Sequence, residues 1–173
     1  ATGLAQNDLI IEFGMVPFCT EKNTLVEDLA MHTFIKCPSF EVLRPNLDDW
    51  VIDHNKELID KAHQSGISLP SFKQKLEKYF NNEQVKNYFD FPSQKIVLFG
   101  KSLNAIDLPF LIRDLGWDFM RKYFHHQVVD LSSTARTLID LQLLPEEASG
   151  GSYLSHLFEI GEVSHTALED AKN

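Results

Sequence analysis

The chain has 173 residues, of which 43% are hydrophobic and 24% are charged, and these proportions are ordinary for a globular protein. With 16 basic and 25 acidic residues its formal net charge is −9, which argues against a protein that grips long nucleic acid by neutralising many phosphates. No stretch approaches the roughly 18 apolar residues that span a membrane, and Cys19 and Cys37 lack the spacing of a metal site. We therefore expect a single cytoplasmic domain over residues 1–173, and the acidity favours small substrates or chain ends.

The first part of the chain predicts two strands followed by a broken helix. An apolar run over residues 8–18 predicts a buried strand, and residues 28–36 predict a second strand after a turn at 20–23. We expect the two strands to pair in an antiparallel manner. A helix in two pieces is predicted over 47–62, and Ser65-Gly66 is a typical helix stop.

The middle of the chain predicts a helix, a strand and another helix. Residues 68–80 begin at a serine-proline segment and carry an apolar stripe at helical spacing. Residues 95–100 are the strongest strand pattern in the sequence. A helix is then predicted over 104–115, ended by Gly116.

The last part of the chain predicts a short strand and several short helices. The strand covers 127–131, and Ser132 and Ser133 are expected to cap a helix that runs to about residue 141. Short helices are predicted over 153–158 and 165–172. Strands that alternate with helices in this order indicate an α/β fold with a mixed sheet.

The clearest chemical signal is the segment His165-Thr-Ala-Leu-Glu-Asp170. A histidine followed five residues later by an aspartate suits a metal-assisted hydrolase, in which the aspartate binds a divalent cation and the histidine takes a proton from water. Five helical steps turn the chain by about 500°, which leaves the two side chains about 140° apart. His165 is therefore expected to precede the helix. Taken alone, the pattern also fits a loop histidine and a solvent-facing aspartate.

Two further segments add weight to that pattern. The chain opens with Ala1-Thr-Gly-Leu4, followed by Asp8-Leu-Ile-Ile-Glu-Phe-Gly14, and Asp107 follows the strand predicted over 95–100. In this order the three segments resemble the DEDDh 3′→5′ exonucleases, and within them the oligoribonucleases. The family pattern is D-x-E-x-T-G-L, a D-x-I-I-E-I-G-like strand, an aspartate after the fourth strand, and H-x-A-x-x-D.

The resemblance implies an RNase H-like exonuclease fold, which is a mixed five-stranded sheet flanked by helices. It matches from the residue after the family's D-x-E, so we expect a strand with those two acids to precede residue 1. It further implies that Asp107 and Asp170 bind two divalent cations, Mg²⁺ or Mn²⁺, and that His165 is the general base. A homodimer is also suggested by the family.

The resemblance also assigns substrate contacts. Ala1 and Thr2 match positions beside the 3′-terminal nucleotide, and Leu4 matches a leucine that wedges against the terminal bases. Trp50 resembles an aromatic that stacks on a base, although a core tryptophan explains it equally well. Ser102 keeps a residue common after the fourth strand of the family.

His125 falls where oligoribonucleases place a His-Tyr-Arg group that caps the 5′ phosphate of the substrate. Here His126 and Gln127 replace the tyrosine and the arginine, so a bidentate phosphate clamp is lost. Asp130 is expected to be structural. We therefore predict an exonuclease that releases 5′-mononucleotides, with short RNA as the preferred substrate and other single-stranded 3′ ends next. The alternatives are a proofreading-type DNA exonuclease and a catalytically inactive module of the same fold that binds nucleotides or a partner protein.

Overall fold

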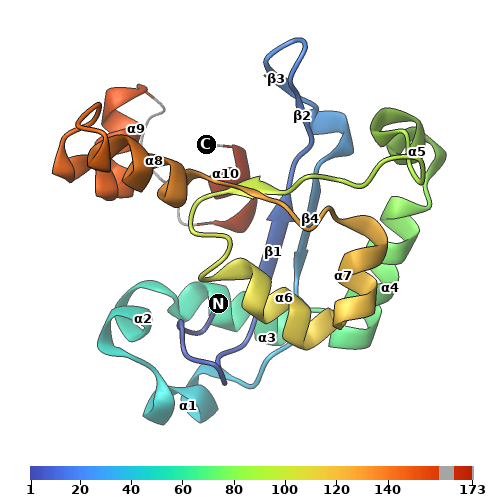
Figure 1. Cartoon of the computed structure of the whole chain (residues 1–173). Helices are drawn as coiled ribbons and strands as arrows, with labels where there is room; N and C mark the ends of the chain where they lie inside the picture. The colour runs from blue at the N-terminus through green and yellow to red at the C-terminus, as the bar shows by residue number, and fades with distance from the viewer. Residues whose placement is uncertain (160–165, 173) are drawn as a thin grey trace. The chain divides into compact units, whose positions relative to one another are not determined.

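The structure is a computed structural model that describes residues 1–159 and 166–172. Helices make up about 53% of it and its strands form small sheets, so the fold is mixed α/β. The chain, coloured from its N-terminus to its C-terminus in Figure 1, divides by its internal contacts into two compact units. Unit 1 comprises Ala1–Asn82 and Thr166–Lys172, and unit 2 comprises the described residues 83–159.

Unit 1 contains the predicted antiparallel pair of strands. Strand β1 (Glu12–Met15) pairs with β4 (Met31–Phe34), with Glu12 opposite Phe34. Both strands are shorter than the predicted 8–18 and 28–36, although the N–H of Ile35 still donates to the carbonyl of Ile11 at 2.9 Å and Ile35 also bridges Ile67. Between them β2 (Phe18–Cys19) and β3 (Thr24–Leu25) form a hairpin around the predicted turn at 20–23.

The helices of unit 1 cover this pair of strands and enclose an apolar core. They are η1 (Glu27–Leu29), α1 (Phe40–Leu43), η2 (Arg44–Asn46), α2 (Asp49–His54), α3 (Lys56–Ser65), α4 (Leu69–Phe80) and α10 (Ala167–Lys172). The break between α2 and α3 and the stop at Ser65 confirm the prediction. Helix α3 ends where Gly66 passes close to other backbone, since a Cβ there would lie 2.3 Å from the oxygen of Ala62. One cluster of buried residues in this core is Ile11, Cys37, Phe40, Val51, Ile59 and Ala62.

Unit 2 contains one parallel pair of short strands and the remaining helices. Strand β5 (Phe99–Gly100) pairs with β6 (Val129–Asp130) in parallel. Ile96 and Phe124, which precede these strands, form an isolated parallel bridge. The helices are α5 (Glu83–Phe89), α6 (Asp107–Leu115), α7 (Trp117–Tyr123), α8 (Leu131–Asp140), η3 (Glu146–Ser149) and α9 (Gly151–Leu157). The strands predicted over 95–100 and 127–131 are therefore present, but only two residues of each belong to a ladder.

Two helix boundaries in unit 2 differ from the prediction. Helix α6 begins at Asp107 rather than at 104, because the N–H of Asn104 donates to the carboxylate of Asp130 at 3.1 Å and the chain turns there. It ends at Gly116 as predicted, where a φ of +90° favours glycine. Helix α8 is capped by Asp130, not by Ser132 and Ser133, whose N–H groups instead donate to the Asp130 carboxylate.

The predicted five-stranded sheet is not seen among the described residues, whose strands form three two-stranded sheets, two antiparallel and one parallel. The prediction of one exonuclease domain over residues 1–173 stays a prediction. Within residues 1–159 and 166–172, none of the helices combines the length and the apolar character needed to cross a membrane.

Candidate functional site

The opening segment of unit 1 is fastened by the carboxylate of Asp8. The Thr2 hydroxyl donates to Oδ1 of Asp8 at 2.9 Å and accepts from the N–H of Leu9 at 2.8 Å, and Thr2 is only 3% exposed. The N–H of Ala5 donates to Oδ2 of Asp8 at 2.7 Å. Gly3 passes so close that a Cβ there would lie 2.5 Å from the same oxygen. The Thr2 hydroxyl, which was predicted to contact substrate, thus makes hydrogen bonds within the protein. These bonds and that from Ala5 to Asp8 hold the opening segment in its conformation.

Leu4 and Trp50 are both exposed in unit 1. The exposed fractions are 72% for Leu4 and 54% for Trp50, which excludes the interpretation of Trp50 as a core residue. The indole stacks on the ring of His54, with centroids 4.5 Å apart and planes 11° apart, and Nδ1 of His54 donates to the carbonyl of Trp50. Asn55, directly after α2, donates to the carbonyl of Ala1 at 3.3 Å. We call this solvent-facing pair of stacked rings, which lies on the same unit as Ala1, the Trp50–His54 platform.

Asp170 is an exposed residue of α10, the last helix of unit 1. Its N–H donates to the carbonyl of Thr166 at 2.8 Å, so it lies in the first full turn of that helix. Helix α10 packs beside β1 (Figure 1), and the N–H of Ala167 donates to the side chain of Glu12 at 3.0 Å. His165, the predicted general base, lies outside the described residues.

Asp107 is the first residue of α6 in unit 2, where an acid is favoured by the helix dipole. Its pKa is raised above the ordinary value, chiefly because neighbouring protein displaces water from the carboxyl; its own backbone N–H opposes the shift, and the charge of Asp130 adds to it. The side chain still keeps a surface open to solvent. An accessible carboxyl with a perturbed pKa is a candidate for a functional group.

Asp130 holds the loop that precedes Asp107. Its Oδ1 accepts from the N–H groups of Ser102, Ser132 and Ser133 at 3.0–3.2 Å, and its Oδ2 accepts from Asn104. Burial works to raise the pKa of this carboxyl, but the four hydrogen bonds outweigh burial and hold that pKa below its ordinary value. The predicted substrate residue Ser102 has a φ of +57°, and its hydroxyl bonds to that of Ser132 at 2.7 Å. Ser102 therefore belongs to this structural network.

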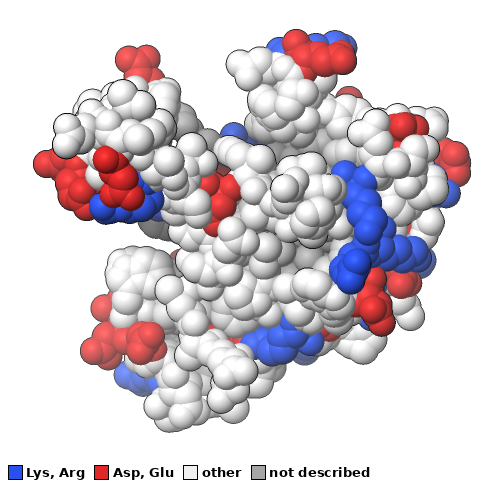
Figure 2. Space-filling model, viewed as in Figure 1, with Lys and Arg blue, Asp and Glu red and all other residues white. Residues whose placement is uncertain are grey.

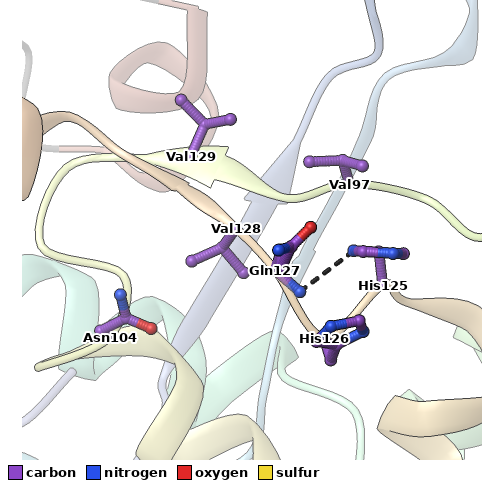
Figure 3. Close-up of a pocket in the computed structure, with 7 residues that line it drawn as sticks. All are labelled: Val97, Asn104, His125, His126, Gln127, Val128 and Val129. Atoms are coloured by element: carbon purple, nitrogen blue, oxygen red, sulfur yellow. Dashed lines mark hydrogen bonds between the residues drawn. The ribbon is translucent and has the colours of Figure 1, made fainter.

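His125 lines an open pocket of about 600 Å³ in unit 2 (Figure 3). The lining residues are Val97, Asn104, His125, His126, Gln127, Val128 and Val129. Nδ1 of His125 accepts from the N–H of Gln127 at 3.1 Å, so the neutral imidazole carries its proton on Nε2. Its ring lies against that of His126, with centroids 4.3 Å apart. The pocket thus combines apolar walls with imidazole and amide groups.

The charges of unit 2 are unevenly spread. Basic side chains gather over the region of α7 (Figure 2), where Arg121 and Lys122 are in the last turn and Lys95 donates to the carbonyl of Arg121. The surface over α8 and η3 is acidic (Figure 2), and there Arg136 pairs with Asp140 at 2.5 Å and with Glu146 at 2.8 Å. Phosphate groups are favoured beside the first region and disfavoured beside the second.

The predicted site residues fall into two sets. Unit 1 carries Ala1, Thr2, Leu4, Trp50 and Asp170, and unit 2 carries Ser102, Asp107 and His125. Among the described residues, no group of three or more His, Cys, Asp and Glu side chains is placed to hold a metal ion. The two predicted ligands, Asp107 and Asp170, are carboxylates, and oxygen donors of this kind suit Mg²⁺ and Mn²⁺.

Sequence reasoning did not single out Glu12 or Asn104. Glu12 carried a signal, since an acid inside an apolar strand must be paired when it is buried. Asn104 carried none, because its place in the pocket depends on how its loop meets the distant segment that carries His125 and Gln127. No protein-family model matches this chain, and the search among curated proteins finds no match.

Proposed function

We propose that the protein is a metal-dependent 3′→5′ exonuclease that releases 5′-mononucleotides, with short RNA as its preferred substrate. One observation carries the proposal most: Asp107 opens the helix that follows the parallel strand β5, is open to solvent and has a raised pKa. The third carboxylate of the DEDDh pattern likewise follows a strand of the sheet, and this likeness supports the proposal.

The fold is in keeping with the proposal at the level of strand pairing. An RNase H-like sheet contains both antiparallel and parallel neighbours, and β1–β4 and β5–β6 supply one pair of each kind. The proposal assigns Asp107 and Asp170 as carboxylate ligands of divalent cations and His165 as the general base. When bound, such cations polarise the phosphate and lower the pKa of an attacking water.

The direct test is cleavage of a 5′-labelled RNA 5-mer and a DNA 5-mer of the same sequence by the purified full-length protein. We expect the label to shift through successively shorter products in Mn²⁺ and to stay at full length in EDTA. The ratio of RNA to DNA rates decides between the RNA enzyme and a proofreading-type relative. Oligonucleotide binding without cleavage in Mn²⁺ would overturn the proposal in favour of an inactive binding module.

Trp50 provides a test of substrate recognition. If the Trp50–His54 platform stacks on a base, replacing Trp50 by alanine removes a contact worth about 1–3 kcal/mol, so KM for the 5-mer rises about tenfold. Trp117 is a matched control, because it is 55% exposed but lies in unit 2. An equal rise in KM for Trp117→Ala would show that the effect is not specific to the platform.

A further inference from the structure

Helix α10 is held to the sheet of unit 1 by one shielded carboxylate. The side chain of Glu12 is only 6% exposed. Its Oε2 accepts from the N–H of Ala167 at 3.0 Å, and its Oε1 pairs with Nε2 of His32 at 2.7 Å. Both oxygens are therefore engaged, one by the first residue of α10 and the other by the neighbouring strand β4.

Gly14 brings the backbones of β1 and α10 into direct contact on the same side. A Cβ at this position would lie 2.4 Å from the nitrogen of Leu168 and 2.5–2.6 Å from the carbonyl carbon and oxygen of Ala167. These are backbone atoms, so they cannot move aside without moving the helix. The hydrogen bond from Ala167 to Glu12 and the close backbone approach at Gly14 thus determine where the first turn of α10 lies against β1.

The other end of α10 is fastened more weakly. Lys172 pairs with Glu27 at 3.1 Å and with Glu169 at 3.3 Å, but those two acids are 65% and 52% exposed. Solvent-exposed ion pairs contribute little to stability. The placement of the helix therefore depends on its first turn, where Glu12 acts.

We propose that Glu12 is a positioning residue that sets the place of the Asp170 carboxylate, an inference that rests on the proposed function. Asp170 lies three residues after Ala167, one turn along the helix that Glu12 fixes. Metal ligands must be held within a fraction of an ångström of the productive geometry, and the groups that orient them affect metal affinity strongly. Glu12 supplies that orientation from strand β1.

The test uses the full-length protein with Glu12→Leu, Glu12→Gln and the control Lys172→Met. Leucine has no acceptor for the N–H of Ala167, whereas glutamine keeps one, and its amide can donate to the other tautomer of His32. We expect hydrogen exchange at 167–172 to accelerate in Glu12→Leu and to stay slow in the other two. Mn²⁺ affinity, followed by the electron paramagnetic resonance of free Mn²⁺, should fall about 10–100-fold in Glu12→Leu and stay unchanged in Glu12→Gln and Lys172→Met.

Gly14→Ala gives a second route to the same result. Its added methyl group displaces α10 while Glu12 stays intact, so it should also weaken Mn²⁺ binding, with circular dichroism as the check of folding for both variants. Unchanged exchange in Glu12→Leu, or unchanged Mn²⁺ affinity despite faster exchange, would overturn the role. A lack of Mn²⁺ binding by the unsubstituted protein would overturn the proposed function and this role with it. The exchange data would then still decide whether Glu12 holds α10, so the two failures are distinguishable.

Discussion

Asp107→Asn and Asp170→Asn are each expected to reduce cleavage of the RNA 5-mer by about 10²–10³-fold, the scale of losing one group that stabilises a transition state. Each substitution keeps the size and shape of the side chain but removes the negative charge that a divalent cation requires. Both positions are open to solvent, so the fold should be retained. Initial rates at saturating Mn²⁺, with circular dichroism as a check of folding, measure the effect.

Each aspartate has a matched control, which is an acid in a similar place on a helix. Asp118 is an exposed acid in the first turn of α7, as Asp107 is in α6, and Glu169 precedes Asp170 on α10. Asp118→Asn and Glu169→Gln should cleave at nearly the unsubstituted rate. Retention of activity in Asp107→Asn or in Asp170→Asn would show that this residue is not a metal ligand, and equal losses in the controls would point to a general charge effect.

Asp130→Ala is expected to lower the free energy of unfolding by about 3 kcal/mol. Among the substitutions of described residues considered, we predict the largest effect on stability for this one. The substitution removes the cap of α8 and leaves four N–H groups without their acceptor. Urea unfolding in a Trp50→Phe background measures it, because Trp117 then reports on unit 2 alone. Asp140→Ala, at the other end of α8 and 58% exposed, should change stability far less.

The same carboxylate predicts an acid-dependent loss of stability. Its pKa is lowered in the folded protein, so its contribution is present above the pKa of an unfolded aspartate, about 3.9, and is lost as the pH falls through the folded value. The difference between the unsubstituted protein and Asp130→Asn should therefore be constant near neutral pH and shrink below about pH 4. A difference that grows in acid would contradict this assignment.

The helix stops and the antiparallel pair could be predicted because local chemistry determines them. Gly66 and Gly116 end helices α3 and α6 where the sequence indicated, and the apolar runs around β1 and β4 mark a buried pair. The extent of β5 could not be predicted in this way. Its apolar pattern covers residues 95–100, whereas the ladder covers only Phe99 and Gly100. The length of a ladder depends on where the distant partner strand runs, which the local sequence does not contain.

The capping of α8 shows a similar limit. Two serines in a row favoured a cap at Ser132 and Ser133, yet Asp130 outcompetes them because a carboxylate accepts several hydrogen bonds at once. Helices α5 and α7 were missed, since one follows a polar segment and the other begins directly after a stop glycine. For the candidate site, the sequence marked Asp107 and Trp50 as candidates but gave no sign that the hydroxyl of Thr2 is bound to Asp8.

The bond between Glu12 and Ala167 joins residues that are 155 positions apart, and this separation constrains how the protein is made. On the ribosome, β1 emerges long before the segment that covers it, while the whole of unit 2 lies between them in the chain. Domains generally fold in the order in which they are synthesised. Unit 1 departs from that order in one respect, because it is complete only after unit 2 has been synthesised, and the face of β1 that carries Gly14 lacks its contact with α10 until residues 166–172 have been made.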